Sequence, residues 1–569
     1  MIPVTSGLAT NRQNVLVTYA TLRRLRRISQ VVFLLAFLLL LLRAEFRGTL
    51  GASGEDIHLR YPVRLFFELD PLIGISNALA SHALYRGLLW SLLVIIPTLF
   101  LGRFFCGWVC PMGSLNHFFG SLKSEKKRGK QLIESNRYKR WQTTKYYILI
   151  ATLIAAFLGT GVVGWLDPFS FLTRSLGLSI LPAFNYMTRA SLRAAETGDS
   201  AVLRQVAGGL HAVLNATVLS FKQPHFRQGL ALGLLFIFIL ALNFRVSRFF
   251  CRALCPLGAL LGVLSRWSIL GLQKDANSCD NCNRCLLRCQ GGDDPIGGVP
   301  WRKAECHLCL NCIGECPHEG LAFKFFPNAE AVTAGPSLAR RKALVGLATG
   351  AAVIPLLRST TAFAAEKSER LLRPPGSLQE SDFLARCIRC GECMKVCPNN
   401  ALHPAWSEAG LEGLWTPVLV PRVGYCEPSC VLCSEVCPTG AIWETSPQSK
   451  GWVVDVSSDT KPIRIGTAFY DRGRCLPWAM ATECIVCEEW CPTSPKAIYL
   501  EPAEVINAMG QTKVVKQPRV DPARCVGCGA CEYACVVQDK PAIYVTSIGE
   551  SRSKTNQILL NQRRKSAKS

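Results

Sequence analysis

Four stretches of almost unbroken apolar residues dominate the first half of the chain. They lie at Ile28–Leu42, Leu88–Leu101, Tyr146–Trp165 and Gly229–Phe244. With their flanks, each can cross a bilayer as an α-helix. Burial of all four in one large soluble core is the alternative interpretation. The pattern predicts a four-helix membrane domain over 28–270, preceded by a cytoplasmic N-terminal segment, 1–27.

Positive charge indicates how these helices are oriented. Nine Lys and Arg residues lie from Lys123 to Lys145, in the link between the second and third stretches. Since cytoplasmic loops carry the excess of basic residues, this link, the N-terminus and the region after Phe244 are expected in the cytoplasm. A fifth crossing at Ala343–Leu357, marginal in length, then takes the rest of the chain to the other side.

A pattern of motifs occurs twice in this domain. The triplet Leu69–Pro71 (Leu-Asp-Pro) precedes the second stretch, which ends in RFFCGWVCPMG. The triplet Leu166–Pro168, also Leu-Asp-Pro, follows the third stretch, and the fourth ends in RFFCRALCPLG. The shared order predicts a two-fold internal repeat about an axis along the membrane normal. An insertion around Arg174–Phe226 enlarges the second half.

Each half of the repeat carries a C-x-x-x-C-P motif. Cys106 and Cys110 in the first half, and Cys251 and Cys255 in the second, are four residues apart, so each pair is expected on one face of a helix. The repeat would bring the four thiols together at the inner surface. They are candidates for an additional metal, an additional cluster or a redox-active dithiol. Packing as small apolar side chains is the alternative.

Two acids occupy matched positions on the outer side, Asp70 and Asp167. Acids at membrane depth are candidate functional residues, so both are candidate catalytic groups that would bind quinol and take its protons. Asp-Pro is also an ordinary helix start, in which the Asp side chain caps the helix. Capping is the preferred interpretation.

The polar region after the fourth stretch, 271–330, contains two cysteine quartets. They are Cys279, Cys282, Cys285 and Cys289, then Cys306, Cys309, Cys312 and Cys316. Their C-x2-C-x2-C-x3-C spacing is that of bacterial ferredoxins, in which three thiolates hold one [4Fe–4S] cubane and the fourth ligates its neighbour. We therefore expect a cytoplasmic two-cluster domain with Cys316 and Cys289 exchanged between the quartets. Structural zinc is the alternative, although zinc sites usually separate two cysteine pairs.

Four further quartets lie in 366–548. They are Cys387, Cys390, Cys393 and Cys397; Cys426, Cys430, Cys433 and Cys437; Cys475, Cys484, Cys487 and Cys491; and Cys525, Cys528, Cys531 and Cys535. Short β-like runs follow three of them, at 441–443, 497–499 and 542–544, as a repeated ferredoxin unit requires. Six [4Fe–4S] clusters are expected in all. Two arrangements are open. Either adjacent quartets exchange their last cysteines, or the first quartet exchanges with the fourth and the second with the third.

The segment Ser337–Ala365 separates the two arrays and resembles a twin-arginine export signal. Arg340 and Arg341 precede a weakly apolar run that ends in the small residues Ala362–Ala364. Such a segment inside the chain predicts that the four-cluster domain, 366–548, lies in the periplasm and that 337–365 is kept as a fifth membrane anchor. A fortuitous Arg-Arg before an amphipathic helix is the alternative. The basic tail, 549–569, is expected to be an extension.

Composition narrows these interpretations. A chain of 569 residues with 28 cysteines and a net charge of +24 is too long and too apolar for one soluble domain. Since the cysteines have cluster spacings, we expect ligands rather than disulfides. Many of the basic residues flank apolar segments, so no nucleic-acid partner is expected. No C-x-x-C-H haem motif occurs.

These motifs carry a resemblance to known families. Residues 20–325 resemble the NapH-type membrane subunit of periplasmic nitrate reductase systems and, more loosely, the polyferredoxin part of NosR; residues 337–545 resemble the NapG and MauM ferredoxin-type proteins. The resemblance implies a quinol dehydrogenase of the bacterial inner membrane. It would take electrons from the quinol pool of the bilayer and deliver them to a periplasmic molybdoenzyme reductase or multihaem cytochrome. An assembly or regulatory protein that supplies electrons to mature or reactivate a metalloenzyme is the alternative.

The expected fold is therefore a membrane α-helical domain of four to five transmembrane helices joined to α+β, bacterial-ferredoxin-like [4Fe–4S] domains.

Overall fold

The computed structural model describes most of the chain. The described residues are 6–46, 57–83, 86–124, 129–197, 200–220, 222–275, 277–280, 282–292, 301–318, 320–326, 344–352, 355, 358–360, 369–450, 462–506, 509–553 and 556. The twin-arginine pair, the small-residue end at Ala362–Ala364 and most of the basic tail lie outside these residues.

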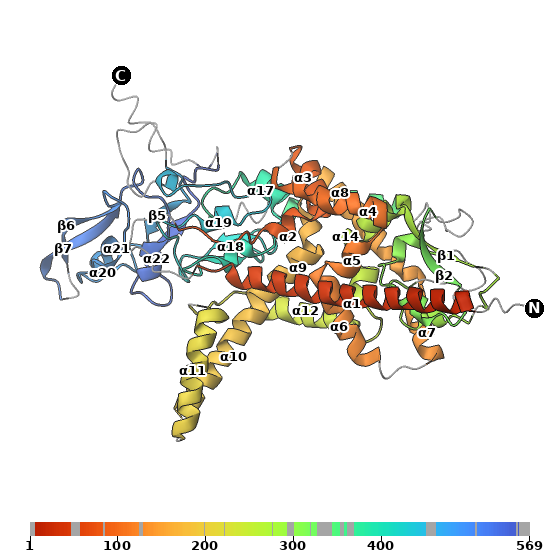
Figure 1. Cartoon of the computed structure of the whole chain (residues 1–569). Coiled ribbons are helices and arrows are strands. Elements are labelled where there is room, and N and C mark those ends of the chain that lie inside the picture. The colour runs from red at the N-terminus through yellow and green to blue at the C-terminus, as the bar shows by residue number, and fades with distance from the viewer. Residues whose placement is uncertain are drawn as a thin grey trace, which may run out of the picture.

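A bundle of helices occupies the middle of an elongated molecule, with a cysteine-rich unit at each end (Figure 1). Its helices are α1 (Ser6–Arg43), α2 (Leu65–Glu68), α3 (Pro71–Ser81), α4 (Leu92–Leu101), α5 (Phe104–Trp108), α6 (Pro111–Ser124), α7 (Lys130–Asn136), α8 (Thr144–Phe157), α9 (Pro168–Ser175), α10 (Leu181–Glu196), α11 (Ala201–Thr217), α12 (Gly229–Leu242), α13 (Phe249–Ala253) and α14 (Pro256–Leu264). The bundle core is aromatic, and Phe66 and Phe105 both pack on Phe169.

The first helix is much longer than predicted. The sequence placed it at Ile28–Leu42, whereas α1 begins at Ser6, because the intervening polar and basic residues are compatible with a helix and the chain does not break before the apolar run. Its part Tyr19–Arg43 is, among the described residues, the one helix long and apolar enough to cross a membrane. Two shorter apolar helices, Leu89–Leu101 and Gly229–Leu242, correspond to the second and fourth predicted stretches.

The third predicted stretch, Tyr146–Trp165, is not one helix. α8 ends at Phe157, and Gly159 then takes a left-handed conformation (φ 82°) that an α-helix cannot continue through. A short 3₁₀ helix, Val162–Trp165, follows. The stretch therefore divides into a helix and a turn that faces the C-terminal unit.

The unit at the N-terminal end of α1 contains the first two quartets. Strand β1 (Leu270–Lys274) pairs antiparallel with β2 (Leu321–Phe325), and Leu272 faces Phe323 in the register. The short helix α15 (Asn311–Glu315) lies between the strands in sequence, and a small core of Leu272, Trp301, Ile313 and Leu321 closes the unit.

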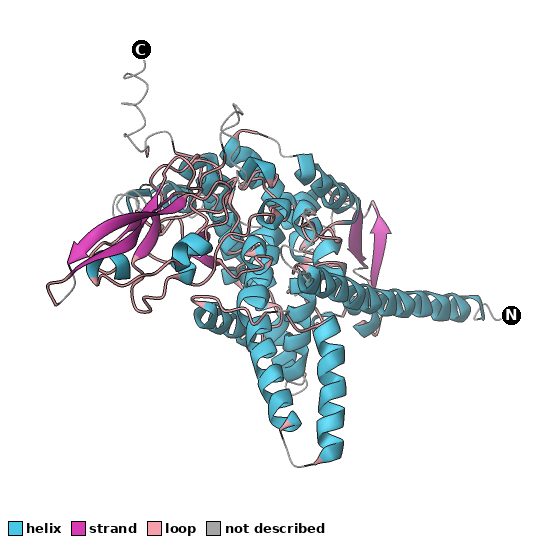
Figure 2. Ribbon diagram, turned by 90° about the vertical axis from the view of Figure 1, so that its left-hand side faces the viewer, coloured by secondary structure: helices cyan, strands magenta, loops and turns pink. Residues whose placement is uncertain are grey.

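The unit at the other end contains the last four quartets and, among its described residues, three two-stranded antiparallel sheets (Figure 2). Its strands are β3 (Leu402–Pro404), β4 (Pro417–Leu419), β5 (Thr467–Tyr470), β6 (Ile498–Ile506), β7 (Thr512–Val520) and β8 (Ile543–Thr546), and its helices are α17 (Glu380–Arg386), α18 (Glu392–Lys395), α19 (Leu432–Glu435), α20 (Leu476–Ala479), α21 (Val486–Glu489) and α22 (Ala530–Ala534). The strands predicted near 497–499 and 542–544 are confirmed as the starts of β6 and β8. The run 441–443 forms only a bridge, from Ile442 to Ser377.

The predicted insertion forms a helical hairpin. α10 and α11 project from the bundle across the direction of α1, at the end where α1 meets the larger unit (Figures 1 and 2). Both helices expose apolar side chains, such as Met187 on α10 and Val206 on α11.

A helical segment at 344–352 runs along α8. A Cβ on Gly346 would lie 3.7 Å from the Tyr147 ring, and one on Gly350 would lie 3.2 Å from the Cα of Ala151. Glycines four apart allow this close helix contact. Further on, Arg358 donates to the carbonyl of Leu158 at the end of α8. The segment therefore follows α8 from one end toward the other.

The start of the predicted tail is held in place by an ion-pair network. The Glu380 carboxylate accepts from Arg373 at 2.6 Å and from Arg552 at 2.6 Å. Burial would raise the pKa of Glu380, but the two guanidinium charges outweigh it and lower the pKa to about 2.

Replacing Glu380 by Gln is expected to destabilise the larger unit by about 2 kcal/mol at neutral pH, a figure reduced for the solvent that reaches the carboxylate. Since the folded pKa is below the unfolded one, this stability is present above the ordinary Glu pKa and is lost as the pH falls toward 2. Denaturant unfolding at several pH values measures it. Glu501→Gln, which breaks an exposed pair with Arg519, is the control and should change little.

Candidate metal centres

The first two quartets of the larger unit exchange their last cysteines. Cys387, Cys390 and Cys393 line one cavity together with Cys437, the last cysteine of the second quartet. The other three thiols of the second quartet, Cys426, Cys430 and Cys433, interact electrostatically with Cys397. Adjacent quartets are therefore intertwined, which is one of the two arrangements that the sequence left open.

The third and fourth quartets are intertwined in the same way. Cys525, Cys528 and Cys531 line a cavity with Cys491. Cys475, Cys484 and Cys487 group with Cys535. The wider spacing between Cys475 and Cys484 accommodates helix α20 and the turn after it.

The smaller unit repeats this geometry. Cys279, Cys282 and Cys285 line one cavity with Cys316, and Cys306, Cys309 and Cys312 line another with Cys289. These are the two groupings expected from the sequence. Cys279 and Cys282 are exposed, whereas Cys309 is buried against the bundle.

The donor sets fit cubanes. Among the described residues, no three His, Cys, Asp or Glu side chains converge closely enough to hold a single metal ion. The four thiols of a group instead surround a space between them, as thiolates bound to four different irons do. The last cysteines also accept backbone N–H groups: Ala401 to Cys397 at 3.3 Å, and Ala542 to Cys535 at 3.4 Å. Such bonds favour an anionic sulfur.

A buried lysine lies beside the group that contains Cys430. The Lys450 ammonium donates to the carbonyls of Glu427 at 2.5 Å and Cys430 at 2.7 Å, and its side chain is almost inaccessible to solvent. Burial raises the pKa of the Cys430 thiol to about 12, and the Lys450 charge opposes that rise. This cation stabilises negative charge at the site.

Replacing Lys450 by Met is therefore expected to lower the reduction potential of a cluster held by Cys426, Cys430, Cys433 and Cys397. Adding an electron makes the cluster more negative, so loss of a nearby cation should lower its reduction potential by on the order of 50–100 mV. Redox titration followed by EPR measures the potential. Lys513→Met, on the exposed face of the β6–β7 hairpin, is the matched control and should leave the potential unchanged.

The two C-x-x-x-C-P motifs form a separate group. The sequence placed both cysteines of a pair on one helix, and this is wrong: α13 ends at Ala253, and Cys255 is the N-cap of α14, its sulfur accepting from the N–H of Gly258 at 3.2 Å. Pro256 explains the break, since proline starts a helix and cannot continue one. Cys106 in α5 and Cys110 before Pro111 repeat this arrangement.

The four thiols of these motifs nevertheless come together. Cys110, Cys251 and Cys255 each interact electrostatically with Cys106. All four are buried in the core of the bundle. Arg103 and Arg248, the residues directly before each Phe-Phe-Cys, are fully buried beside them, and Arg248 donates to the carbonyl of Cys106 at 3.1 Å. Buried cations favour thiolates over thiols.

This thiol group abuts the smaller cysteine unit. A Cβ on Gly107 would lie 2.1 Å from the carbonyl oxygen of His307, a contact that only glycine permits. The indole of Trp108 donates to the carbonyl of Leu308 at 3.1 Å. His307 and Leu308 lie between Cys306 and Cys309, so the first motif touches the second quartet.

The opposite end of the bundle abuts the larger unit through a second pair of glycines. The N–H of Gly161 donates to the carbonyl of Leu384 at 3.0 Å, and a Cβ on Gly164 would lie 1.8 Å from the carbonyl oxygen of Ile388. The buried Arg174 donates to the carbonyl of Arg389 at 2.8 Å. The run 159–164 has the spacing G-x-G-x-x-G, but it follows a helix rather than a strand and serves here as a docking surface.

The two candidate acids cap helices, which confirms the interpretation preferred from the sequence. Asp70 accepts from the N–H of Leu72 at 2.7 Å at the start of α3, and Asp167 accepts from the N–H of Ser170 at 2.8 Å at the start of α9. Both are fully buried, and the two carboxyl groups interact electrostatically with each other. Their use in quinol chemistry stays a prediction.

Sequence reasoning missed the buried cations. Arg103, Arg248, Arg174, Arg389 and Lys450 were not selected, because charged residues are usually exposed. A signal was available for two of them, since an Arg precedes Phe-Phe-Cys in both motifs.

Comparison with known proteins supports iron–sulfur chemistry at both kinds of site. The family described as a 4Fe-4S binding domain matches residues 83–131 and 228–271, which contain the C-x-x-x-C-P motifs. The family described as a 4Fe-4S dicluster domain matches residues 386–441, which contain the first two quartets of the larger unit. No solved structure matches the chain.

Three relatives show the extent of the similarity. The methylamine utilization ferredoxin-type protein MauM of Methylophilus methylotrophus is 37% identical over 177 residues, which are 30% of this chain and 70% of the relative. MauM of Methylorubrum extorquens is 35% identical over 214 residues, 37% of this chain and 84% of the relative. The ferredoxin-type protein NapG of Escherichia coli is 33% identical over 219 residues, 37% of this chain and 87% of the relative.

Proposed function

The chain belongs to the family of ferredoxin-type proteins that includes MauM and NapG, and from this premise we propose that it is a membrane-bound quinol dehydrogenase that passes electrons through [4Fe–4S] clusters to a redox partner in the periplasm. That the protein is an iron–sulfur electron-transfer protein follows from its family and its 4Fe-4S domains. The membrane arrangement, the quinol, the partner and the number of clusters are the proposal.

One observation carries the proposal: two cysteine-rich units are docked on opposite ends of a single apolar bundle. The core of that bundle contains both the thiols of the C-x-x-x-C-P motifs and Cys390 of the larger unit. In the proposal six cubanes occupy the six cysteine groups, and the four motif thiols hold a further cluster between the units. Each cubane supplies one-electron transfer, and the protein tunes it by burial and nearby charge.

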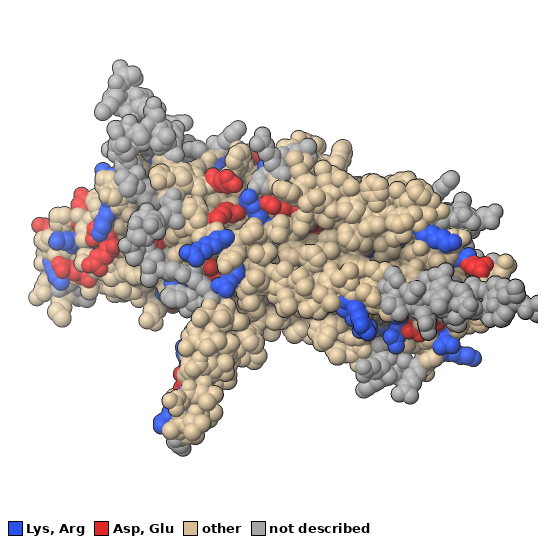
Figure 3. All heavy atoms as spheres, viewed as in Figure 1, with Lys and Arg blue, Asp and Glu red and all other residues tan. Residues whose placement is uncertain are grey.

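The surface of the bundle supports a membrane environment. Leu93, Ile96 and Phe100 of α4, and Leu234 and Ile237 of α12, are about half exposed although they are apolar. On the face in Figure 3, charged side chains gather toward the two ends and leave the middle of the bundle uncharged. In the proposal α1, α4, α8, α12 and the segment at 344–352 cross the bilayer together, as in a NapH-type subunit.

The course of the segment at 344–352 supports its retention as an anchor. It packs along α8 through Gly346 and Gly350 and so connects the two units within one chain. In the proposal the smaller unit is cytoplasmic and the larger one periplasmic. An alkaline phosphatase fused after Ala365 should be active and one fused after Phe326 inactive; equal activity would contradict this topology.

Reduction by quinol tests the function. The full chain, prepared anaerobically in liposomes, should show its clusters reduced by menaquinol or ubiquinol, as EPR signals that match those produced by dithionite. If dithionite reduces the clusters and neither quinol does, the dehydrogenase proposal fails and a role in maturing or reactivating a metalloenzyme is favoured instead.

The motif thiols give a separate prediction. Exchanging Cys106 and Cys251 together for Ser is expected to remove about four irons per chain if the motifs hold a cubane, and to slow electron exchange between the two units. Iron analysis and EPR measure this. The matched control, Ser114→Ala with Ser265→Ala, leaves the thiols unchanged. Unaltered iron and unaltered EPR signals in the cysteine variant would show that the thiols only pack.

A further inference from the structure

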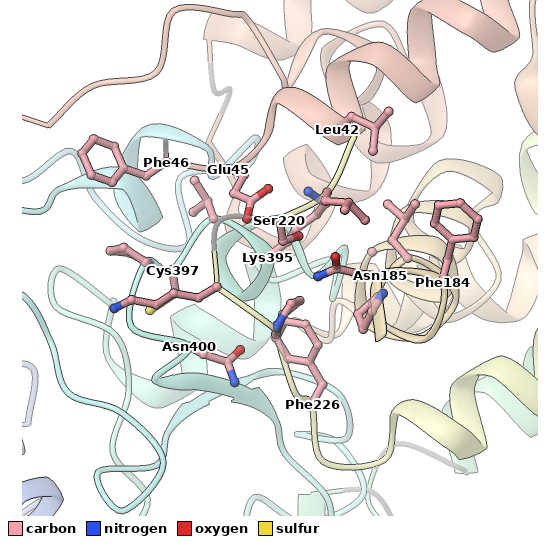
Figure 4. Close-up of a pocket in the computed structure, with 18 of the residues that line it drawn as sticks. Leu42, Glu45, Phe46, Phe184, Asn185, Ser220, Phe226, Lys395, Cys397 and Asn400 are labelled. Atoms are coloured by element: carbon pink, nitrogen blue, oxygen red, sulfur yellow. The ribbon is translucent and has the colours of Figure 1, made fainter. Parts of the chain in front are cut away.

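A cavity of about 350 Å³ lies where the apolar helix α1 ends, beside the larger cysteine unit. It is bounded by four parts of the chain: the end of α1, the first turns of α10, the segment 218–226 that follows α11, and the loop that carries Cys397 (Figure 4). Its lining is mostly apolar, with Leu42, Leu181 and Phe226 among the contributing side chains. Its size is that of a site for a small organic ligand.

One polar group in this cavity lacks a partner. Asn185 is 3% exposed, and its Oδ1 accepts from the guanidinium of Arg189 at 3.1 Å. That bond fixes the orientation of the amide, and the Nδ2 amino group has no hydrogen-bond partner in the described protein. An unsatisfied buried donor costs free energy, so a ligand with an acceptor oxygen would gain from meeting it.

The wall opposite α10 is formed by the loop of a cluster ligand. Cys397 and Asn400 both line the cavity, and Lys395, the last residue of α18 before this loop, donates to the carbonyl of Ala44 at 3.2 Å, which holds the start of the loop against the end of α1. Figure 4 shows Glu45, Asn185 and Cys397 around the same space. A ligand here would lie beside Cys397, which is a ligand of a proposed cubane, and at the end of a proposed membrane-crossing helix.

We propose that this cavity binds the head group of quinol, an inference that rests on the proposed function and names its site. Asn185 donates to one quinol or quinone oxygen, and the apolar lining accepts the ring while the tail leaves toward the bilayer past Leu42 and Leu181. Oxidation of one quinol to quinone releases two protons and two electrons. The protons would pass to the Glu45 carboxylate and on to water, and cubanes held by the cysteines of the larger unit would accept the two electrons, one each.

This assignment differs from the one based on sequence. Asp70 and Asp167, the candidate quinol acids, do not line the cavity. One carboxylate oxygen of each already accepts a backbone N–H at the start of a helix. The cavity instead uses residues of the insertion, which the repeat alone would not have singled out.

Direct labelling tests the site without depending on turnover. A short-chain azido-ubiquinone and an azido-naphthoquinone are photolysed with the full chain as purified, and the adducts are mapped by mass spectrometry. Labels are expected on 181–185, 42–46 or 395–400, and an excess of the unmodified quinone should remove them. Competed labels confined to other segments would overturn the assignment.

Matched variants sharpen the test. Asn185→Leu should weaken quinone binding by about three- to tenfold, the value of one hydrogen bond. Leu181→Trp, which fills the cavity, should weaken it by at least about tenfold. The control is Asn215→Leu, which also removes a bond to Arg189 but lies on the exposed face of α11 outside the cavity.

The outcomes separate the site from the function. If quinol reduces the clusters of the wild type and of both cavity variants at the same rate, and binding is unchanged, the site is wrong while the function holds. If quinol fails to reduce even the wild type, the proposed function fails, and competed labelling of the cavity would still establish it as a quinone site. Reduction by dithionite and an unchanged iron content show that each variant is folded.

Discussion

Replacing Cys437 by Ser is expected to remove the cluster of Cys387, Cys390 and Cys393, although Cys437 belongs to the next quartet in the sequence. The structure places its sulfur in their cavity. A cubane that loses one of four thiolates is usually lost or degraded, so iron should fall by up to about four per chain. EPR should show the same signal missing in Cys437→Ser and Cys387→Ser.

The matched variant is Cys397→Ser, the last cysteine of the first quartet. It groups with Cys430 and Cys433 and should therefore remove a different signal. The opposite result, with Cys397→Ser and Cys387→Ser losing the same signal, would show that each quartet holds its own cubane. If Cys437→Ser lost the same signal as a variant of the third quartet, such as Cys487→Ser, the arrangement that pairs the first quartet with the fourth and the second with the third would be correct.

Gly164→Val is expected to detach the larger unit from the bundle. A Cβ at this position would lie 1.8 Å from the carbonyl oxygen of Ile388, so either the 3₁₀ turn or the first quartet loop must move. Overpacking of this kind costs about 1–3 kcal/mol and more when backbone atoms are opposed. Electron exchange between the units should slow, since its rate depends on the contact.

Thermal unfolding and limited proteolysis of the full chain measure this effect, with the iron content as a check that the clusters persist. Gly208→Ala is the control: a Cβ there meets nothing within 4 Å, and in the middle of α11 alanine should stabilise the helix by up to about 1 kcal/mol. Equal thermal stability and equal resistance to proteolysis in the two variants would mean that the contact at Gly164 does not hold the units together.

Much of the cysteine geometry could be predicted from spacing. A ferredoxin quartet has one arrangement that satisfies a cubane, so the groups around Cys316 and Cys289 followed from the sequence. The exchange between Cys397 and Cys437 did not follow from the sequence, because the two possible arrangements of the four quartets use the same set of cysteines. The fold selects between them, since α18 packs against α19 and α21 packs against α22.

The helical bundle was harder to predict. Apolar runs locate helices but do not reveal where they end, so the turn at Gly159 was hidden inside an apolar stretch. The two cysteines of a C-x-x-x-C-P motif were placed on one helix by their spacing, and the proline directly after the second cysteine, where a new helix starts, was overlooked. The cavity beside Asn185 has no local signal, because its walls come from four separate segments of the chain.

The helix at 344–352 ties the two units into one polypeptide, held along α8 by Gly346 and Gly350. In the proposed topology this segment is retained, so the two units stay joined, whereas separate proteins would have to collide before an electron could move between them. The exchange is consequently first order: diluting the protein should leave its rate constant untouched, and the two halves can never be synthesised in unequal amounts.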